Sequence, residues 1–223
     1  MIKRLLITTI LLFYSVLSFA ESWSGSGFFI AQNGYIATAS HVVGNQSTGK
    51  LATSVKVVYK GVTYTAKVIA VDFKNDVAII KIHVHDNYVY KVQPYSNPGD
   101  IVYAAGHPLG VTDTRVTNGT ITDSANGWIY TNLYICHGNS GGVLLDSSNN
   151  ALGVTVGVYV LGGDSYCSYA SISSNITNVE MLAISKNVQL IYATTDRVVY
   201  TKGKIQSIIN QTNSVPLIFG SND

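Results

Sequence analysis

The stretch "GNSGGVLLD" at residues 138–146 sets a glycine-flanked serine directly before an apolar run that is typical of a buried strand. Glycine reaches backbone conformations that other residues avoid, so Ser140 can be presented on a sharp turn. The motif alone is ambiguous, because glycine-rich loops are also ordinary surface turns. A serine hydroxyl is a weak nucleophile at neutral pH, and a catalytic role therefore requires a base, a carboxylate and oxyanion donors elsewhere in the chain.

A histidine and an aspartate that could complete such a site lie upstream of Ser140. The segment "ATASHVV" places His41 at the end of an expected strand, and "NDVAIIKI" places Asp76 at the head of another. The chain order His, Asp, Ser is one of the known orders of the catalytic triad. Taken singly, His41 could be a surface or core residue and Asp76 a turn residue. Together, in a strand-rich chain, the three residues predict a serine hydrolase.

The composition is that of a β-rich chain with no sign of a nucleic-acid partner. Charged residues make up 12% of the sequence, against about 25% in an average globular domain. The difference is filled by β-branched residues, serine and 15 tyrosines, and β-branched and aromatic residues favour strands. Without Lys3 and Arg4 the chain carries equal numbers of basic and acidic residues, which argues against binding to nucleic acid.

The first twenty residues have the pattern of a secretory signal peptide. Lys3 and Arg4 precede an apolar run over residues 5–17, and small residues follow at 18–20. A membrane-spanning helix needs about 20 apolar residues, and no other run approaches that length. We therefore expect a secreted or periplasmic protein without a stable membrane anchor once residues 1–20 are removed.

The rest of the chain consists of short β-rich runs separated by turn signals, which suits a barrel or a sandwich. The longest candidate connector, "YKVQPYSNPGD" at residues 90–100, lies where two halves could meet. We expect a first half over residues 21–92, with His41 and Asp76, and a second over residues 93–223, with Ser140 and a C-terminal tail. Beyond Ala183 the pattern fits either strands or a closing helix.

Several of these segments resemble the trypsin-like serine protease superfamily, and specifically its HtrA/Deg branch. "GSGFFIAQNGYIATASHVV" is similar to that family's first hairpin and histidine loop, "FKNDVAIIKI" to its aspartate segment, "PGDIVYAAGHPLG" to the strand that enters its second barrel, and "GNSGGVLLD" to its nucleophile loop. The resemblance runs from about Gly25 to Ile176. It implies an all-β, chymotrypsin/trypsin-like fold of two packed antiparallel six-stranded β-barrels, with the active site between them.

The resemblance also implies a role for each candidate residue. His41 would be the general base, Asp76 would orient it, and Ser140 would be the nucleophile. The backbone N–H groups of Gly138 and Ser140 would form the oxyanion hole. In trypsin an aspartate before the serine pairs with a new N-terminus, but Asn139 cannot form that ion pair. Activation by that route is therefore not expected.

No cofactor or metal is expected. His83 and His85 have the spacing of a metal pair, but they follow the Asp76 strand, and a solvated face is the simpler interpretation.

Cys136 and Cys167 depart from the HtrA pattern, which usually has Asn-Pro before "GNSGG". Composition alone leaves open whether these cysteines form a disulfide or remain buried thiols. A cysteine four residues before the nucleophile resembles the trypsin and chymotrypsin branch, where it bonds a cysteine in the loop that closes the substrate pocket. That resemblance implies a Cys136–Cys167 disulfide.

Substrate preference is inferred from the positions that the superfamily uses for its pocket. By resemblance the pocket base falls on Tyr134, followed by Ile135, and no carboxylate is present there to select lysine or arginine. Val156, Gly157 and Val158 would offer their backbone to an extended peptide substrate. We therefore expect an apolar residue before the cleaved bond.

The sequence predicts a secreted serine endopeptidase that forms an acyl-enzyme on Ser140. Two alternatives stay open: a catalytically silent protease-fold binding module with a blocked cleft, and an esterase or toxin-like protease with one narrow target. The chain after Ile176 is too short for the PDZ domain of most HtrA-like proteins, and the trimerisation segment of that family has no counterpart before Gly25. We therefore expect a monomer.

Overall fold

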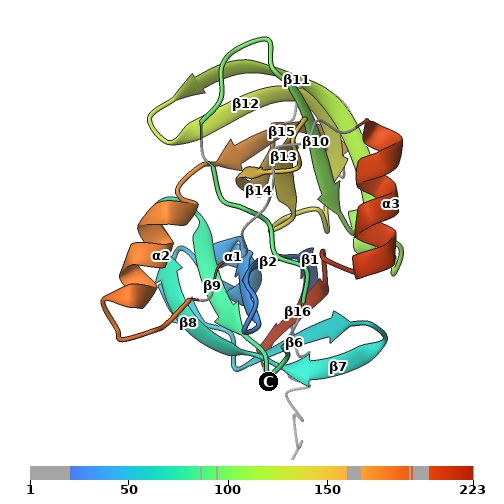
Figure 1. The fold of residues 1–223 in the computed structure, drawn as a ribbon. Coiled ribbons are helices and arrows are strands. Elements are labelled where there is room, and N and C mark those ends of the chain that lie inside the picture. Colours follow the sequence, from blue (N-terminus) through green and yellow to red (C-terminus); the bar gives the residue numbers. More distant parts are fainter. Residues whose placement is uncertain are drawn as a thin grey trace, which may run out of the picture.

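The computed structural model describes residues 21–85, 87–93, 95–159, 167–190, 192 and 201–222. The described chain is mostly strand, and the predicted all-β, trypsin-like fold is confirmed (Figure 1). The predicted signal peptide at residues 1–20 lies outside the described residues. None of the described helices is long and apolar enough to span a membrane.

The second half forms a closed six-stranded barrel in the order β10-β11-β12-β15-β14-β13. Side chains alternate between the interior and solvent along its strands, as a half-buried strand requires. In β12, for example, Ile129, Leu133 and Ile135 are buried, whereas Tyr130 and Tyr134 are exposed. The elements are β10 (Ile101–Gly106), the 3-10 turn η1 (Pro108–Gly110), β11 (Arg115–Ala125), β12 (Trp128–Cys136), β13 (Val143–Asp146), β14 (Ala151–Tyr159) and β15 (Cys167–Ser173).

The first half consists of two four-stranded sheets, in the orders β1-β16-β6-β7 and β2-β3-β9-β8, and a short β4-β5 pair. The strand β16 (Leu217–Asn222) comes from the end of the chain. The first half thus differs from the closed six-stranded barrel that the resemblance implied for it. The elements are β1 (Glu21–Ser26), β2 (Phe28–Ala31), β3 (Tyr35–Thr38), the single turn α1 (Ser40–Val43), β4 (Gly44–Asn45), β5 (Lys50–Leu51), β6 (Ser54–Tyr59), β7 (Val62–Thr65), β8 (Lys67–Asp72) and β9 (Val77–Lys81).

The segment that joins the two halves is bonded to both of them. The N–H of Tyr90 donates to Phe29 in β2 (3.0 Å), and the carbonyl of Lys91 accepts from Ala151 in β14 (2.8 Å). The Tyr90 ring is fully buried, and its hydroxyl is 2.7 Å from that of Ser214. The first two residues of the predicted connector, Tyr90 and Lys91, are therefore hydrogen-bonded to both halves, and Tyr90 is buried between them.

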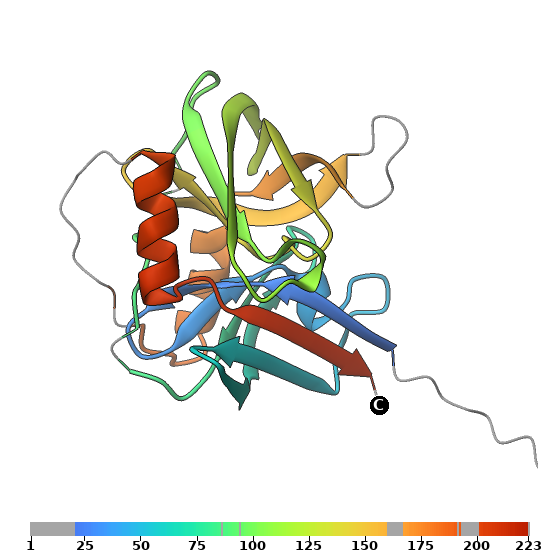
Figure 2. The same ribbon diagram turned by 90° about the vertical axis from the view of Figure 1, so that its right-hand side faces the viewer.

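The end of the chain returns to the first half. Two helices, α2 (Ile176–Ile184) and α3 (Lys202–Thr212), pack on β8 and β9 and on β11 respectively, and β16 (Leu217–Asn222) follows α3. Figure 2 shows β16 running beside β1, with which it pairs antiparallel, while its other edge pairs with β6. The predicted C-terminal tail of the second half thus ends as a strand of the first half.

Candidate active site

Neighbouring strands of the first half bring His41 and Asp76 together. β3 leads into α1, which carries His41, and β9 begins directly after Asp76 and pairs with β3. The Nδ1 atom of His41 is 2.7 Å from Oδ2 of Asp76. The other carboxylate oxygen, Oδ1, accepts from the Ser40 hydroxyl (2.8 Å) and the His41 N–H (3.0 Å). Asp76 therefore fixes both the ring and the backbone of His41.

The ionised form of Asp76 is favoured despite its burial. Burial by itself raises the pKa of this carboxyl, but the hydrogen bond and charge of the His41 side chain, with the bonds from Ser40 and the His41 backbone, outweigh it. The net pKa of Asp76 lies below its ordinary value. A carboxylate held in this state stabilises a histidine that has taken up a proton.

Five consecutive carbonyl groups accept hydrogen bonds from the protein, from Cys136 at the end of β12 to Ser140 in the loop that follows. The donors are the N–H of Asn139 to Cys136 (3.1 Å), the N–H of Leu109 to His137 (2.5 Å), the hydroxyl of Ser26 to Gly138 (2.7 Å), the N–H of Gly142 to Asn139 (2.8 Å) and the N–H of Ser26 to Ser140 (2.7 Å).

The N–H groups of Gly138 and Ser140 are, by contrast, left without an acceptor in the described part of the chain. In a planar trans peptide the C=O and N–H point in opposite directions. The carbonyls of His137 and Asn139 face the protein, so the N–H groups of the same two peptides face away from those anchors. Two unpaired, fixed donors next to a serine are what an oxyanion hole requires.

The position of Gly138 requires glycine for two reasons. Its φ is +90°, which is unfavourable for residues with a side chain. A Cβ atom there would also clash with the carbonyl oxygen of His107. Any other residue at this position would therefore move the loop that carries the two unpaired donors.

His41 and Ser140 line the same cavity, which has a volume of about 540 Å³. Among the described residues the Ser140 hydroxyl makes no hydrogen bond. In free enzymes the bond between nucleophile and base is often loose and tightens when substrate binds. The other residues that line the cavity are Trp23, Ser24, Leu109, His137 and Gly138.

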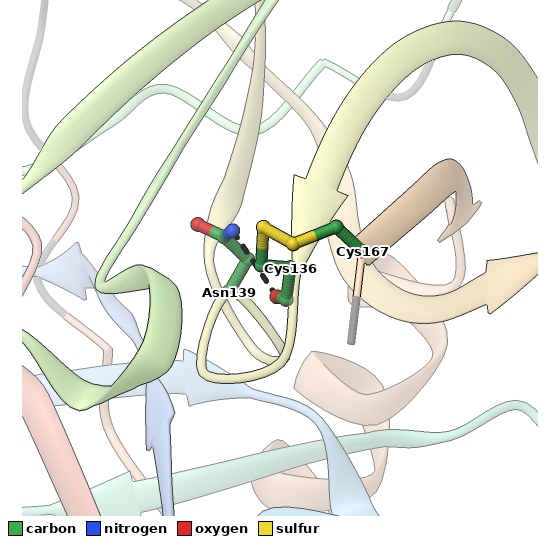
Figure 3. Close-up of a disulfide and its surroundings, with 3 residues drawn as sticks. All are labelled: Cys136, Asn139 and Cys167. Atoms are coloured by element: carbon green, nitrogen blue, oxygen red, sulfur yellow. Dashed lines mark hydrogen bonds between the residues drawn. A yellow bond between two sulfur atoms is a disulfide. The ribbon is translucent and has the colours of Figure 1, made fainter. Parts of the chain in front are cut away.

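A disulfide joins Cys136 and Cys167, as the resemblance implied (Figure 3). The two cysteines face each other in the register of β12 and β15. Asn139 lies beside them, and its side-chain amide donates to the Cys136 carbonyl (3.1 Å). The disulfide therefore anchors the start of the loop that carries Ser140 to the neighbouring strand.

The residues predicted to bind substrate have different surroundings. Tyr134 is half exposed and its ring meets that of Tyr169 edge-on, whereas Ile135 is buried in the barrel core. Val156 is also buried. At Gly157 and Val158 one edge of β14 pairs with β15, but the pairing of β14 with β13 ends at Val154. On that edge Thr155 still bonds Gly141 and Gly142 (2.6 and 2.8 Å), and only residues 156–158 lack a strand partner there in the described chain.

The sequence did not identify two residues that line the cavity, Trp23 and Leu109, or Ser26, which bonds the loop that carries Ser140. Trp23 is held by a hydrogen bond from its indole N–H to Val42 (2.9 Å). Leu109 is exposed and has φ +56°, a conformation that costs a non-glycine residue about 1–2 kcal/mol. Ser26 bonds the nucleophile loop from β1. Only the small residues around Ser26 in "GSG" hinted at a close approach of backbones.

Comparison with known proteins settles the relationship that the motifs indicated. The model of the trypsin-like peptidase domain matches residues 25–154. The chain belongs to the trypsin-like peptidase family. Curated relatives of the chain include serine protease HTRA1 of Xenopus tropicalis, 31% identical over 216 residues that cover 86% of the chain and 44% of the relative. A second is the putative serine protease HhoB of Synechocystis, 33% identical over 152 residues (62% of the chain, 35% of the relative).

Solved structures agree with the sequence relatives. The serine endoprotease from Yersinia pestis superposes with a TM-score of 0.61 at 25% identity, and the match covers 73% of the present chain and 58% of that chain. The HtrA-type protease AlgW with a decapeptide gives a TM-score of 0.58 at 26% identity, covering 73% and 51% of the two chains. The predicted similarity to the HtrA branch is confirmed. The chain spans less than half the length of the curated relatives described above.

Proposed function

We propose that this protein is a serine endopeptidase that hydrolyses peptide bonds through an acyl-enzyme on Ser140. One observation carries the proposal: His41, which is bonded to Asp76, lines the same cavity as Ser140. The N–H groups of Gly138 and Ser140 at this cavity have no acceptor among the described residues. Base, orienting carboxylate, nucleophile and oxyanion donors thus meet at one place. This is the minimum set for acyl transfer.

The chemical steps follow from this geometry. His41, oriented through its Nδ1 by Asp76, accepts the Ser140 proton on Nε2 as the hydroxyl attacks the peptide carbonyl. The negative charge that develops on the carbonyl oxygen is stabilised by the N–H groups of Gly138 and Ser140. Protonated His41 then gives its proton to the leaving amine. Water, activated by His41 in the same way, hydrolyses the acyl-enzyme.

An extended peptide would bind along residues 156–158 of β14, with the part that precedes the cleaved bond on this edge. Backbone bonds to residues 156–158 would align the peptide by strand addition. We propose an apolar residue before the cleaved bond, because Tyr134, which is placed at the pocket base by resemblance, offers no charge to a basic side chain. The leaving-group side would lie in the cavity beside Trp23 and Leu109.

The compartment and the partners are parts of the same proposal. We propose export through residues 1–20, followed by action on peptide or protein substrates as a monomer. A peptide partner is supported by the structure of the HtrA-type protease AlgW solved with a decapeptide. The two alternatives, a silent binding module and a protease with one narrow target, share the fold and differ in turnover.

The test is cleavage of a mixed peptide library by residues 21–223, with the cut sites read by mass spectrometry. We expect cleavage after apolar residues, complete loss in Ser140→Ala, and retention in His83→Ala, a histidine outside the site. Cleavage mainly after basic or acidic residues would refute the proposed preference. Folded protein without any turnover would favour the binding module.

A further inference from the structure

Ser26, the last residue of β1, contacts the two residues whose N–H groups face the catalytic cavity. Its hydroxyl donates to the carbonyl of Gly138 (2.7 Å), and its N–H donates to the carbonyl of Ser140 (2.7 Å). The two partners are distant in sequence from Ser26, so these bonds attach the nucleophile loop to β1, a strand from another part of the chain.

The direction of the hydroxyl bond is fixed by a third contact. The N–H of His107 donates to the Ser26 oxygen (2.9 Å), so the hydroxyl acts as an acceptor there. Its single proton is then available only for the Gly138 carbonyl. Thr38 completes the set by donating its hydroxyl to the Ser26 carbonyl (2.7 Å). Ser26 is fully buried, and all of its polar groups are bonded.

The loop needs such an anchor because of its own glycine. Gly138 must be glycine to avoid the carbonyl of His107, but glycine is also the residue most free to rotate away from a given conformation. Rotation of the Gly138–Asn139 peptide would move the N–H groups on both sides of it. The Ser26 hydroxyl opposes this rotation by holding the Gly138 carbonyl.

We propose that Ser26 is a positioning residue for the oxyanion hole: its buried hydroxyl fixes the peptide that lies between the two oxyanion donors. The proposal rests on the proposed function of Ser140 and Gly138. It concerns the transition state rather than substrate binding, because Ser26 is buried behind the loop and does not line the cavity.

The test compares Ser26→Ala with Ser214→Ala. Ser214 is an equally buried serine whose hydroxyl bonds Tyr90 (2.7 Å), so its removal also leaves a buried polar group without its partner. In Ser26→Ala we expect kcat to fall roughly 10- to 100-fold, as for a small displacement of catalytic groups. KM should change less than about threefold, and the acid limb of the pH profile should not move. Ser214→Ala should keep the wild-type kcat.

Hydrogen exchange gives a second measurement that does not depend on catalysis. The amide of Leu109 in η1 donates to the loop carbonyl of His137, and the amide of Asn139 donates to Cys136. Exchange of both amides should accelerate at least about tenfold in Ser26→Ala but not in Ser214→Ala. Unchanged exchange in Ser26→Ala, or equal effects of the two variants on exchange and kcat, would overturn the role of Ser26. A wild-type protein that cleaves nothing would instead refute the proposed function, and exchange would still decide whether Ser26 holds the loop.

Discussion

Asp76 illustrates how neighbouring groups decide the state of one residue. Burial disfavours its charge, but His41 and Ser40 together keep the pKa of the carboxyl low. The stabilising contribution of this carboxylate is therefore present above its ordinary pKa of 3.8 and is lost as the pH falls through the lowered pKa. The proximity of His41, Asp76 and Ser140 could be predicted from the sequence because each of them lies in a short, specific motif. Ser26 could not, since its role depends on contacts with residues more than eighty positions away.

Asp76→Asn should abolish most activity while leaving the fold intact. An asparagine can keep the bonds to Ser40 and the His41 backbone, but it favours the wrong tautomer of the His41 ring. We expect kcat to fall roughly 10⁴-fold, measured by peptide cleavage at neutral pH. Asp113→Asn, at an exposed aspartate, is the control and should keep full activity. A loss of less than tenfold in Asp76→Asn would contradict the role of Asp76.

At the scale of elements, the strands of the second barrel were readable because inward and outward residues alternate, as in β12. The segment beyond Ala183 was ambiguous for a physical reason. Helix α3 has its start and stop signals, Thr201 as N-cap and Asn213 in a left-handed conformation, but its neighbour β16 pairs with strands from the beginning of the chain. Such long-range pairing leaves no local signal in the sequence.

Glu180 on α2 is a buried carboxyl that should make stability depend on pH. Burial raises its pKa to about 7, an effect that the hydrogen bond from Tyr192 only partly offsets. A raised pKa means that stability is greatest below the ordinary value of 4.5 and falls as the pH rises through about 7. Glu180→Gln should therefore stabilise the protein at pH 8 by about 1–3 kcal/mol, with little gain at pH 4.

Urea unfolding of wild type and Glu180→Gln at pH 4 and pH 8 measures this difference. Asp113→Asn serves again as the exposed control and should show no comparable gain at pH 8. Equal effects of Glu180→Gln at the two pH values would contradict the account of Glu180.

At the scale of the whole molecule, the first and the last strand of the described residues pair in one sheet. β16 lies between β1 and β6. β1 is the edge strand of that sheet and pairs there with β16. β1 in turn carries Trp23 at the cavity and Ser26 behind the nucleophile loop. The C-terminal strand therefore supports the active site from a distance. The sequence predicted two halves, but it did not predict that the last strand would join the first.

Ile218→Ala should be strongly destabilising, because this side chain is fully buried on β16, a strand that is paired along both of its edges. We expect a loss of about 2–4 kcal/mol in the free energy of unfolding, measured by denaturant titration. Phe219→Ala, on the exposed face of the same strand, is the matched control and should cost less than about 1 kcal/mol. Equal losses in the two variants would show that β16 does not contribute to the core.

The most direct test of the central claim is the covalent labelling of residues 21–223 by a fluorophosphonate probe, with the adduct located by peptide mass spectrometry. The probe requires an activated serine and a formed oxyanion hole. The structure predicts one adduct, on Ser140, which is absent in Ser140→Ala and lost in His41→Ala. Folded, disulfide-bonded protein that shows no adduct, or an adduct on another serine, would contradict the assignment of Ser140 as the nucleophile.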